Sequence, residues 1–164
     1  MAGTLPLRRI AARRRFGAIR RGMPPADHPG LRLRLAHEAR RVAAQHDAID
    51  AFEREVRAAF EGGAEPAIER SLRSLERALA AHFAIERDVH FPALHGLAPA
   101  LAPELRALEQ EHRHFLEDLA RLLADRDAPV SSRLRAFSTL TEALQRHEDR
   151  EEALLGRSTP AKTE

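Results

Sequence analysis

The sequence contains no cysteine, tryptophan or tyrosine, and seven phenylalanines are the only aromatic residues besides histidine. The absence of cysteine excludes disulfide bonds, thiolate zinc sites, iron–sulfur clusters and thiol nucleophiles. No apolar run approaches the ~18 residues of a membrane-spanning helix, so we expect no membrane span. No glycine-rich phosphate loop, nucleophile elbow or zinc-finger spacing is present either. Any chemistry must therefore come from the nine histidines and the carboxylates.

The net charge of +2 is the sum of a strongly basic N-terminal segment and an acidic remainder of the chain. Residues 1–22 contain seven arginines and no acidic residue, whereas residues 23–164 contain 20 basic and 25 acidic residues. Three interpretations of this arm stay open: a disordered or untranslated extension preceding a true start at Met23, a contact with nucleic acid, and an organellar transit peptide. The arm has no secretory apolar core, so we expect a cytoplasmic protein.

Helix-forming residues dominate, β-branched residues are scarce, and apolar residues recur every three or four positions. This pattern predicts an all-α protein, an antiparallel up-down-up-down four-helix bundle with a disordered basic N-terminal arm. The predicted helices are residues 31–61, 66–91, 103–124 and 131–155. We expect Pro92 to end the second helix. The predicted divisions are an arm and non-helical proline-rich linker over residues 1–30, the bundle over 31–156, and a disordered tail over 157–164.

Two His-x3-Glu pairs lie on the apolar faces of predicted helices. At about 100° per residue, His82 and Glu86 differ by only about 40° around their helix, and His147 and Glu151 repeat the arrangement. Both pairs continue apolar stripes, so they are predicted to point into the bundle. A carboxylate there is costly unless it is paired or bound to a metal.

The other two helices each offer one inward histidine, His46 and His112, among apolar neighbours at helical spacing. Antiparallel helices bring such positions to similar heights, so four imidazoles and two carboxylates can converge. A lone buried histidine is more often a hydrogen-bonded core residue, and a lone His-x3-Glu pair is more often exposed. The combination on four helices favours a dinuclear metal centre.

Further residues lie near these positions and have two interpretations each. His90 is either a peripheral ligand or a half-buried residue near the helix end. Asp50 and Glu53, on the face of His46, and Glu111, beside His112, are either partners of the metal ligands or solvated charges. The histidines expected to be ordinary surface, packing or turn residues are His28, His37, His95 and His114.

Three segments carry a family resemblance: AHFAIERDVHFPAL at residues 81–94, LEQEHRHFLEDL at 108–119 and LQRHEDREEALL at 144–155. Over about residues 31–155 the chain resembles the hemerythrin-like family, also called the HHE cation-binding domain, a four-helix bundle with a non-haem di-iron site. The resemblance implies two irons, bridged by carboxylates and by oxo or hydroxo groups, with zinc or manganese as alternatives. The implied ligands are His46, His82, His112 and His147, with Glu86 and Glu151 as bridges.

The chain departs from the oxygen-carrying members at two points. Those proteins have a second histidine four residues after the third-helix histidine, where this chain has Leu116. They also use His-x4-Asp on the fourth helix, whereas this chain has Glu151 at the fourth position and Glu152 at the fifth, so either glutamate can be the ligand. Fewer imidazoles leave coordination positions for water, hydroxide or peroxide.

Three functions remain as hypotheses. The first is a di-iron protein that binds or senses oxygen, a related small oxidant such as peroxide, or iron itself. The second is a di-iron enzyme on the same scaffold that acts on peroxide or a small substrate. The third is a metal-free helical module that binds nucleic acid or another partner through its arginine-rich arm. The sequence predicts no particular oligomeric state.

Overall fold

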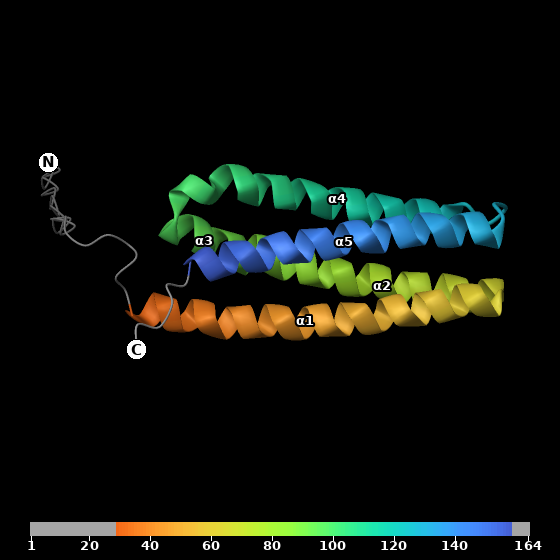
Figure 1. The fold of residues 1–164 in the computed structure, drawn as a ribbon, viewed down its shortest axis with the longest axis horizontal. Coiled ribbons are helices and arrows are strands. Elements are labelled where there is room, and N and C mark those ends of the chain that lie inside the picture. Colours follow the sequence, from red (N-terminus) through yellow and green to blue (C-terminus); the bar gives the residue numbers. More distant parts are fainter. Residues whose placement is uncertain (1–28, 159–164) are drawn as a thin grey trace, which may run out of the picture.

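The computed structural model describes residues 29–158, and every element in that range is a helix (Figure 1). The elements are α1 (Pro29–Gly62), α2 (Glu65–Ile85), the π-helical turn η2 (Glu86–His90), α3 (Phe91–Leu97), the 3-10 turn η3 (Pro99–Leu101), α4 (Ala102–Ala124) and α5 (Val130–Ser158). The predicted all-α class is confirmed for this part of the chain. The predicted disordered arm and most of the predicted tail, with His28, lie outside the described residues.

The four long helices α1, α2, α4 and α5 lie side by side, and the chain direction alternates from one to the next (Figure 1). α1 packs against α2, α2 against α4, α4 against α5, and α5 against α1, so the helices enclose a common interior. The short α3 lies at the end of the bundle where α1 begins (Figure 1). Every long helix can therefore contribute side chains to one central layer.

The turn between α1 and α2 follows directly from the local sequence. Gly63 adopts a positive φ of 69°, which glycine tolerates without steric cost, and its N–H donates to the Ala59 carbonyl at 3.1 Å. Pro66 lies in the first turn of α2, where a missing backbone N–H removes no helical hydrogen bond. The predicted break at Gly62–Gly63 is confirmed.

Pro92 does not end the second helical segment, so that prediction is wrong. α2 gives way to η2, a π-helical turn in which the Phe91 N–H donates to the Glu86 carbonyl five residues earlier. Pro92 then occupies the first turn of α3, where its missing N–H has no consequence. The helical path continues to Leu97.

The outer helix ends also differ from the predictions. α1 begins at Pro29, so the predicted non-helical linker is too long by two residues; proline at the first helical position needs no N–H partner. α5 continues through Gly156 to Ser158, beyond the predicted end at residue 155. One glycine in a helix costs only about 1 kcal/mol relative to alanine, too little to stop a long helix.

Two apolar clusters fill the bundle interior. The larger reaches from the middle of the bundle to the α1–α2 turn; among its fully buried members are Val56, Ile68, Leu72, Leu75, Leu79, Leu119 and Phe137. The smaller packs around α3 and consists of Val42, Phe91, Leu94, Leu105, Leu108, Leu154 and Leu155. On α1, α4 and α5, the polar residues described below lie between the members of the two clusters.

Replacement of Leu75, a fully buried member of the larger cluster, tests this packing. We expect Leu75→Ala to lower the free energy of unfolding by about 2–5 kcal/mol, since it leaves a cavity among close-packed side chains. Urea denaturation followed by circular dichroism measures the loss. Val89→Ala is the control, because Val89 is 47% exposed and its truncation should change stability by less than about 0.5 kcal/mol. Equal losses in the two variants would contradict the described core.

Candidate metal centre

Each long helix places one buried histidine near the boundary between the two apolar clusters, and on α2 this histidine directly precedes Phe83 of the larger cluster. On α1, His46 follows Val42 of the smaller cluster and precedes Ile49 of the larger one. The four histidines are His46, His82, His112 and His147, and each is no more than 7% exposed. The apolar spacing that forms the helices therefore also sets the histidines at one level of the bundle.

The π-helical turn brings a carboxylate to the same level. Glu86 is the first residue of η2 and is fully buried. A π turn widens the helix by one residue, and such turns occur frequently at functional sites. Glu86 and His90 are both buried as a result, although they lie at opposite ends of the turn.

Glu86 contacts two histidines from different helices, one with each carboxylate oxygen. Its Oε1 lies 2.9 Å from His82 Nε2, and its Oε2 lies 3.2 Å from His112 Nε2. His112 Nε2 is in turn 3.0 Å from His147 Nε2. A carboxylate with its two oxygens turned toward separate imidazoles has the arrangement of a bridging ligand.

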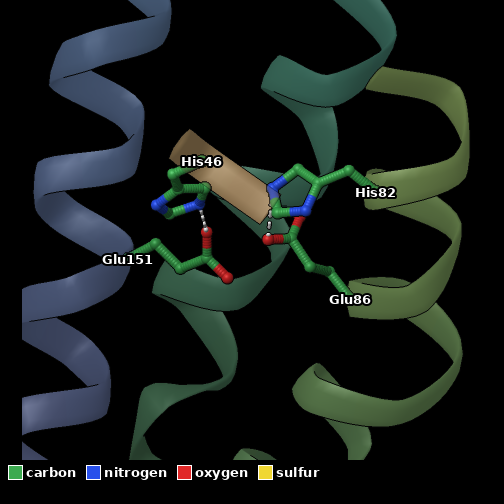
Figure 2. A group of neighbouring side chains, drawn as sticks. All are labelled: His46, His82, Glu86 and Glu151. Atoms are coloured by element: carbon green, nitrogen blue, oxygen red, sulfur yellow. Dashed lines mark ion pairs between the residues drawn. The ribbon is translucent and has the colours of Figure 1, made fainter. Parts of the chain in front are cut away.

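A second buried carboxylate, Glu151 on α5, completes one side of the centre. Its Oε2 lies 3.6 Å from His46 Nε2, and Figure 2 shows this pair opposite His82 and Glu86. The ligand atoms fall into two groups, each within 4.8 Å: His46, His82, Glu86 and Glu151 form the first, and Glu86, His112 and His147 form the second. Glu86 is common to both groups, whereas Glu151 belongs to one.

The opposite ring nitrogens of two histidines have their own partners. His82 Nδ1 lies 3.0 Å from the Gln45 side-chain oxygen, and His147 Nδ1 lies 2.9 Å from Glu111 Oε2, which also contacts Arg150. Both partner oxygens are acceptors, so each Nδ1 carries the proton and donates. Each Nε2 is then left with a lone pair directed into the centre.

The lone pairs of these nitrogens face other hydrogen-bond acceptors instead of donors. A metal cation between them would interact favourably with both. His82 Nε2, both oxygens of Glu86, both oxygens of Glu151 and both ring nitrogens of His46 are buried without a hydrogen-bond partner. Close approach of unprotonated nitrogen and carboxylate oxygen is repulsive unless a cation lies between them. The donor set of imidazole and carboxylate suits first-row transition metals.

Electrostatics keep three of the imidazoles neutral, which is the form that binds metal. Burial lowers the pKa of His82 to about 4 and the pKa of His112 to about 3. Burial also lowers the pKa of His147, against the opposing effect of Glu111. His46 differs: burial lowers its pKa, but contacts with Glu151 and the charge of Glu148 outweigh burial and raise it.

The two buried carboxyl groups share one proton in the absence of a cation. Burial, together with the contact to Glu151, raises the pKa of Glu86. Burial acts in the same direction on Glu151, but its interactions with His46 and Glu86 prevail and lower that pKa. Two carboxylates this close ionise together only when positive charge is supplied.

The remaining predicted residues take different places. His90 is buried but belongs to neither ligand group. Glu152 Oε1 lies 3.4 Å from His46 Nδ1, and the Glu152 side chain is 60% exposed. Asp50 is half-buried and also lies outside both groups. Glu111 contacts His147 and lies outside both groups. Of the histidines expected to be ordinary, the described ones, His37, His95 and His114, are exposed.

The sequence interpretation missed three polar residues near the centre. Gln45 and Arg150 have no sequence signal, because their partners lie 37 and 39 residues away. Glu148 did have a sequence signal, because it follows Leu144 by four residues on the inward face of α5. In the structure it is only 5% exposed. Burial, with the negative charge of Asp50 and Glu151, raises the pKa of Glu148 to about 7.

The pKa of Glu148 makes stability depend on pH in a definite direction. Since it is higher in the folded protein, the protonated carboxyl contributes stability below about pH 4.5 that is lost as the pH rises through 7. We expect Glu148→Gln to stabilise the metal-free protein by about 1–2 kcal/mol at pH 8 and much less at pH 5, measured by urea denaturation. Asp149→Asn, at the exposed neighbouring position, is the control. A benefit independent of pH would contradict the burial of this charge.

Comparisons with known proteins agree with this geometry. Neither the curated proteins nor the solved structures gave a match to the chain. The family model described as the hemerythrin HHE cation binding domain matches residues 34–157, which include the four histidines and the two glutamates of the candidate centre. No helix within residues 29–158 is both long enough and apolar enough to span a membrane. The chain belongs to the hemerythrin HHE cation-binding domain family.

Proposed function

We propose that the protein binds two iron ions at the histidine and glutamate centre and uses them to bind or sense oxygen, a related small oxidant or iron. The observation that supports this most directly is Glu86, whose two oxygens face His82 on α2 and His112 on α4. One fully buried carboxylate shared by two ligand groups calls for two cations rather than one.

Iron is the metal that the donors favour under this proposal. Imidazole and carboxylate together form the di-iron sites of helical bundles, where glutamates and histidines project inward from facing helices. Bound iron supplies reversible one-electron chemistry and coordination positions for a small oxidant. Zinc and manganese accept the same donors and are the alternatives that metal analysis distinguishes.

The protein's own residues hold and orient the ligands. Gln45 and Glu111 fix the tautomers of His82 and His147, so that each Nε2 faces inward. Phe83 stacks on His112 with a centroid separation of 3.9 Å and an interplanar angle of 6°, which restrains that ring and keeps water from its face.

The two halves of the centre differ in their number of ligands. The group of Glu86, His112 and His147 offers three residues, and the other group offers four. A metal position with fewer protein ligands retains more places for an external molecule. We therefore assign binding of the small oxidant to the side of His112 and His147.

Metal analysis of the purified full-length protein, combined with its optical spectrum, tests the proposal. We expect about two iron ions per chain, and ferric charge-transfer bands that disappear on reduction and return in air. Glu86→Gln should lose most of the metal, because it removes the ligand shared by both groups. Glu117→Gln, at an exposed position on α4, should keep both ions.

The other functions predict different outcomes of the same measurements. Consumption of peroxide that depends on bound iron would identify an enzyme rather than a binder or sensor. Stoichiometric zinc with a featureless spectrum would point to a structural role. A folded protein from iron-replete cells that contains no metal would contradict the proposal and favour a helical module acting through its arginine-rich arm.

Glu111 provides a separate test of the partners outside the ligand groups. Burial acts to raise its pKa, but Arg150 and His147 prevail, so the carboxylate is ionised and accepts the His147 proton. We expect Glu111→Gln to weaken metal affinity by roughly 10- to 100-fold, measured by competition with a chromogenic chelator. An affinity equal to that of the exposed control Glu117→Gln would show that the contact with His147 does not support the centre.

A further inference from the structure

A cluster of carboxylates lies between α1 and α5, directly beside His46. Asp50 and Glu53 come from α1, and Glu148 and Glu152 come from α5; we call these four residues the acidic seam. They are buried to different depths: the Glu152 side chain is 60% exposed, Asp50 and Glu53 are half-buried, and Glu148 is 5% exposed. The seam therefore extends from solvent into the bundle.

Glu148 is the unusual member, because its charge is buried without a sufficient counterion. Its Oε1 is buried and has no hydrogen-bond partner in the structure. The largest charge effect on it comes from His46, which lowers its pKa, and the negative charges of Asp50, Glu151 and Glu152 act in the opposite direction. An unpaired buried carboxylate among other carboxylates is destabilising unless a proton or a cation neutralises it.

The groups that act most strongly on the Glu148 charge include no arginine. Arg54 and Arg57 act on Glu53, and Arg57 donates a hydrogen bond to Ser138 at 3.3 Å. Burial and the charge of Glu148 are the two largest effects on Glu53, and both raise its pKa. The electrostatic potential between these two carboxylates is thus negative, which attracts small cations.

The seam leads into the metal centre through His46. The Nδ1 atom of His46 lies 3.4 Å from Glu152 Oε1 on the solvent side, and its Nε2 atom lies 3.6 Å from Glu151 Oε2 on the inner side. Glu148 precedes Glu151 by three residues on α5, so the two side chains lie on one face of that helix. Oxygen ligands are therefore present from the exposed end to the first ligand group.

We propose that the acidic seam is a transit site for a divalent cation, where Glu53 and Glu148 hold the ion before it reaches His46 and Glu151. This inference rests on the proposed metal-binding function. The seam carboxylates fall outside the two groups whose ligand atoms converge within 4.8 Å. An ion held there keeps part of its water shell, as hard divalent cations do with carboxylate ligands, and can move on to the imidazoles.

The test measures how fast metal enters the full-length, metal-free protein. Stopped-flow mixing with Co²⁺ follows the visible absorption that develops as the ion binds imidazole and carboxylate. We expect the double variant E53Q/E148Q to load at least about tenfold more slowly than the wild type, because the attracting charges are gone. The number of ions bound at the end should be unchanged, since neither residue belongs to a ligand group.

A matched control separates the seam from general charge. The double variant E55Q/E61Q makes the same two replacements at exposed glutamates of α1. Loading of E53Q/E148Q at the rate of this control would overturn the transit site while leaving the metal centre intact. A wild-type protein that takes up no Co²⁺ would overturn both proposals. Thermal unfolding establishes that each variant is folded. If the double variant is not folded, Glu53→Gln alone provides the same test, because this position is only half-buried.

Discussion

The burial of Glu86 is the constraint on which the rest of the structure depends. A fully buried carboxylate is stable only beside positive charge, and its two oxygens are directed at His82 and His112 on different helices. Since the partners of His82 and His147 leave lone pairs facing inward, bound cations are the positive charge that this arrangement fits. The family of the chain, a cation-binding domain, agrees with this requirement.

The architecture isolates this polar layer between two apolar clusters. The larger cluster lies toward the α1–α2 turn and the smaller surrounds α3, so water is kept from the imidazoles on both sides. Burial in turn lowers the pKa of His82 and His112 and keeps them neutral near pH 7. The apolar packing that stabilises the bundle thus also prepares its histidines for metal, and the acidic seam beside His46 links them to solvent.

The helices and the inward histidines could be predicted because both depend on the 3.6-residue period, which is a local property of the chain. The pairing of Gln45 with His82 could not, because it depends on how two helices are placed along each other over a separation of 37 residues. The π-helical turn was missed for a different reason. Pro92 indicates a helix end in α geometry, and the sequence carries no separate signal for the wider turn that precedes it.

The central claim is that two metal ions lie on either side of the Glu86 carboxylate. Crystals of the iron-loaded full-length protein, with diffraction collected at the iron absorption edge, locate the ions directly by their anomalous scattering. The account predicts two peaks about 3.5–4 Å apart, one beside His46, His82 and Glu151 and the other beside His112 and His147. A single peak, or iron bound away from Glu86, would contradict it.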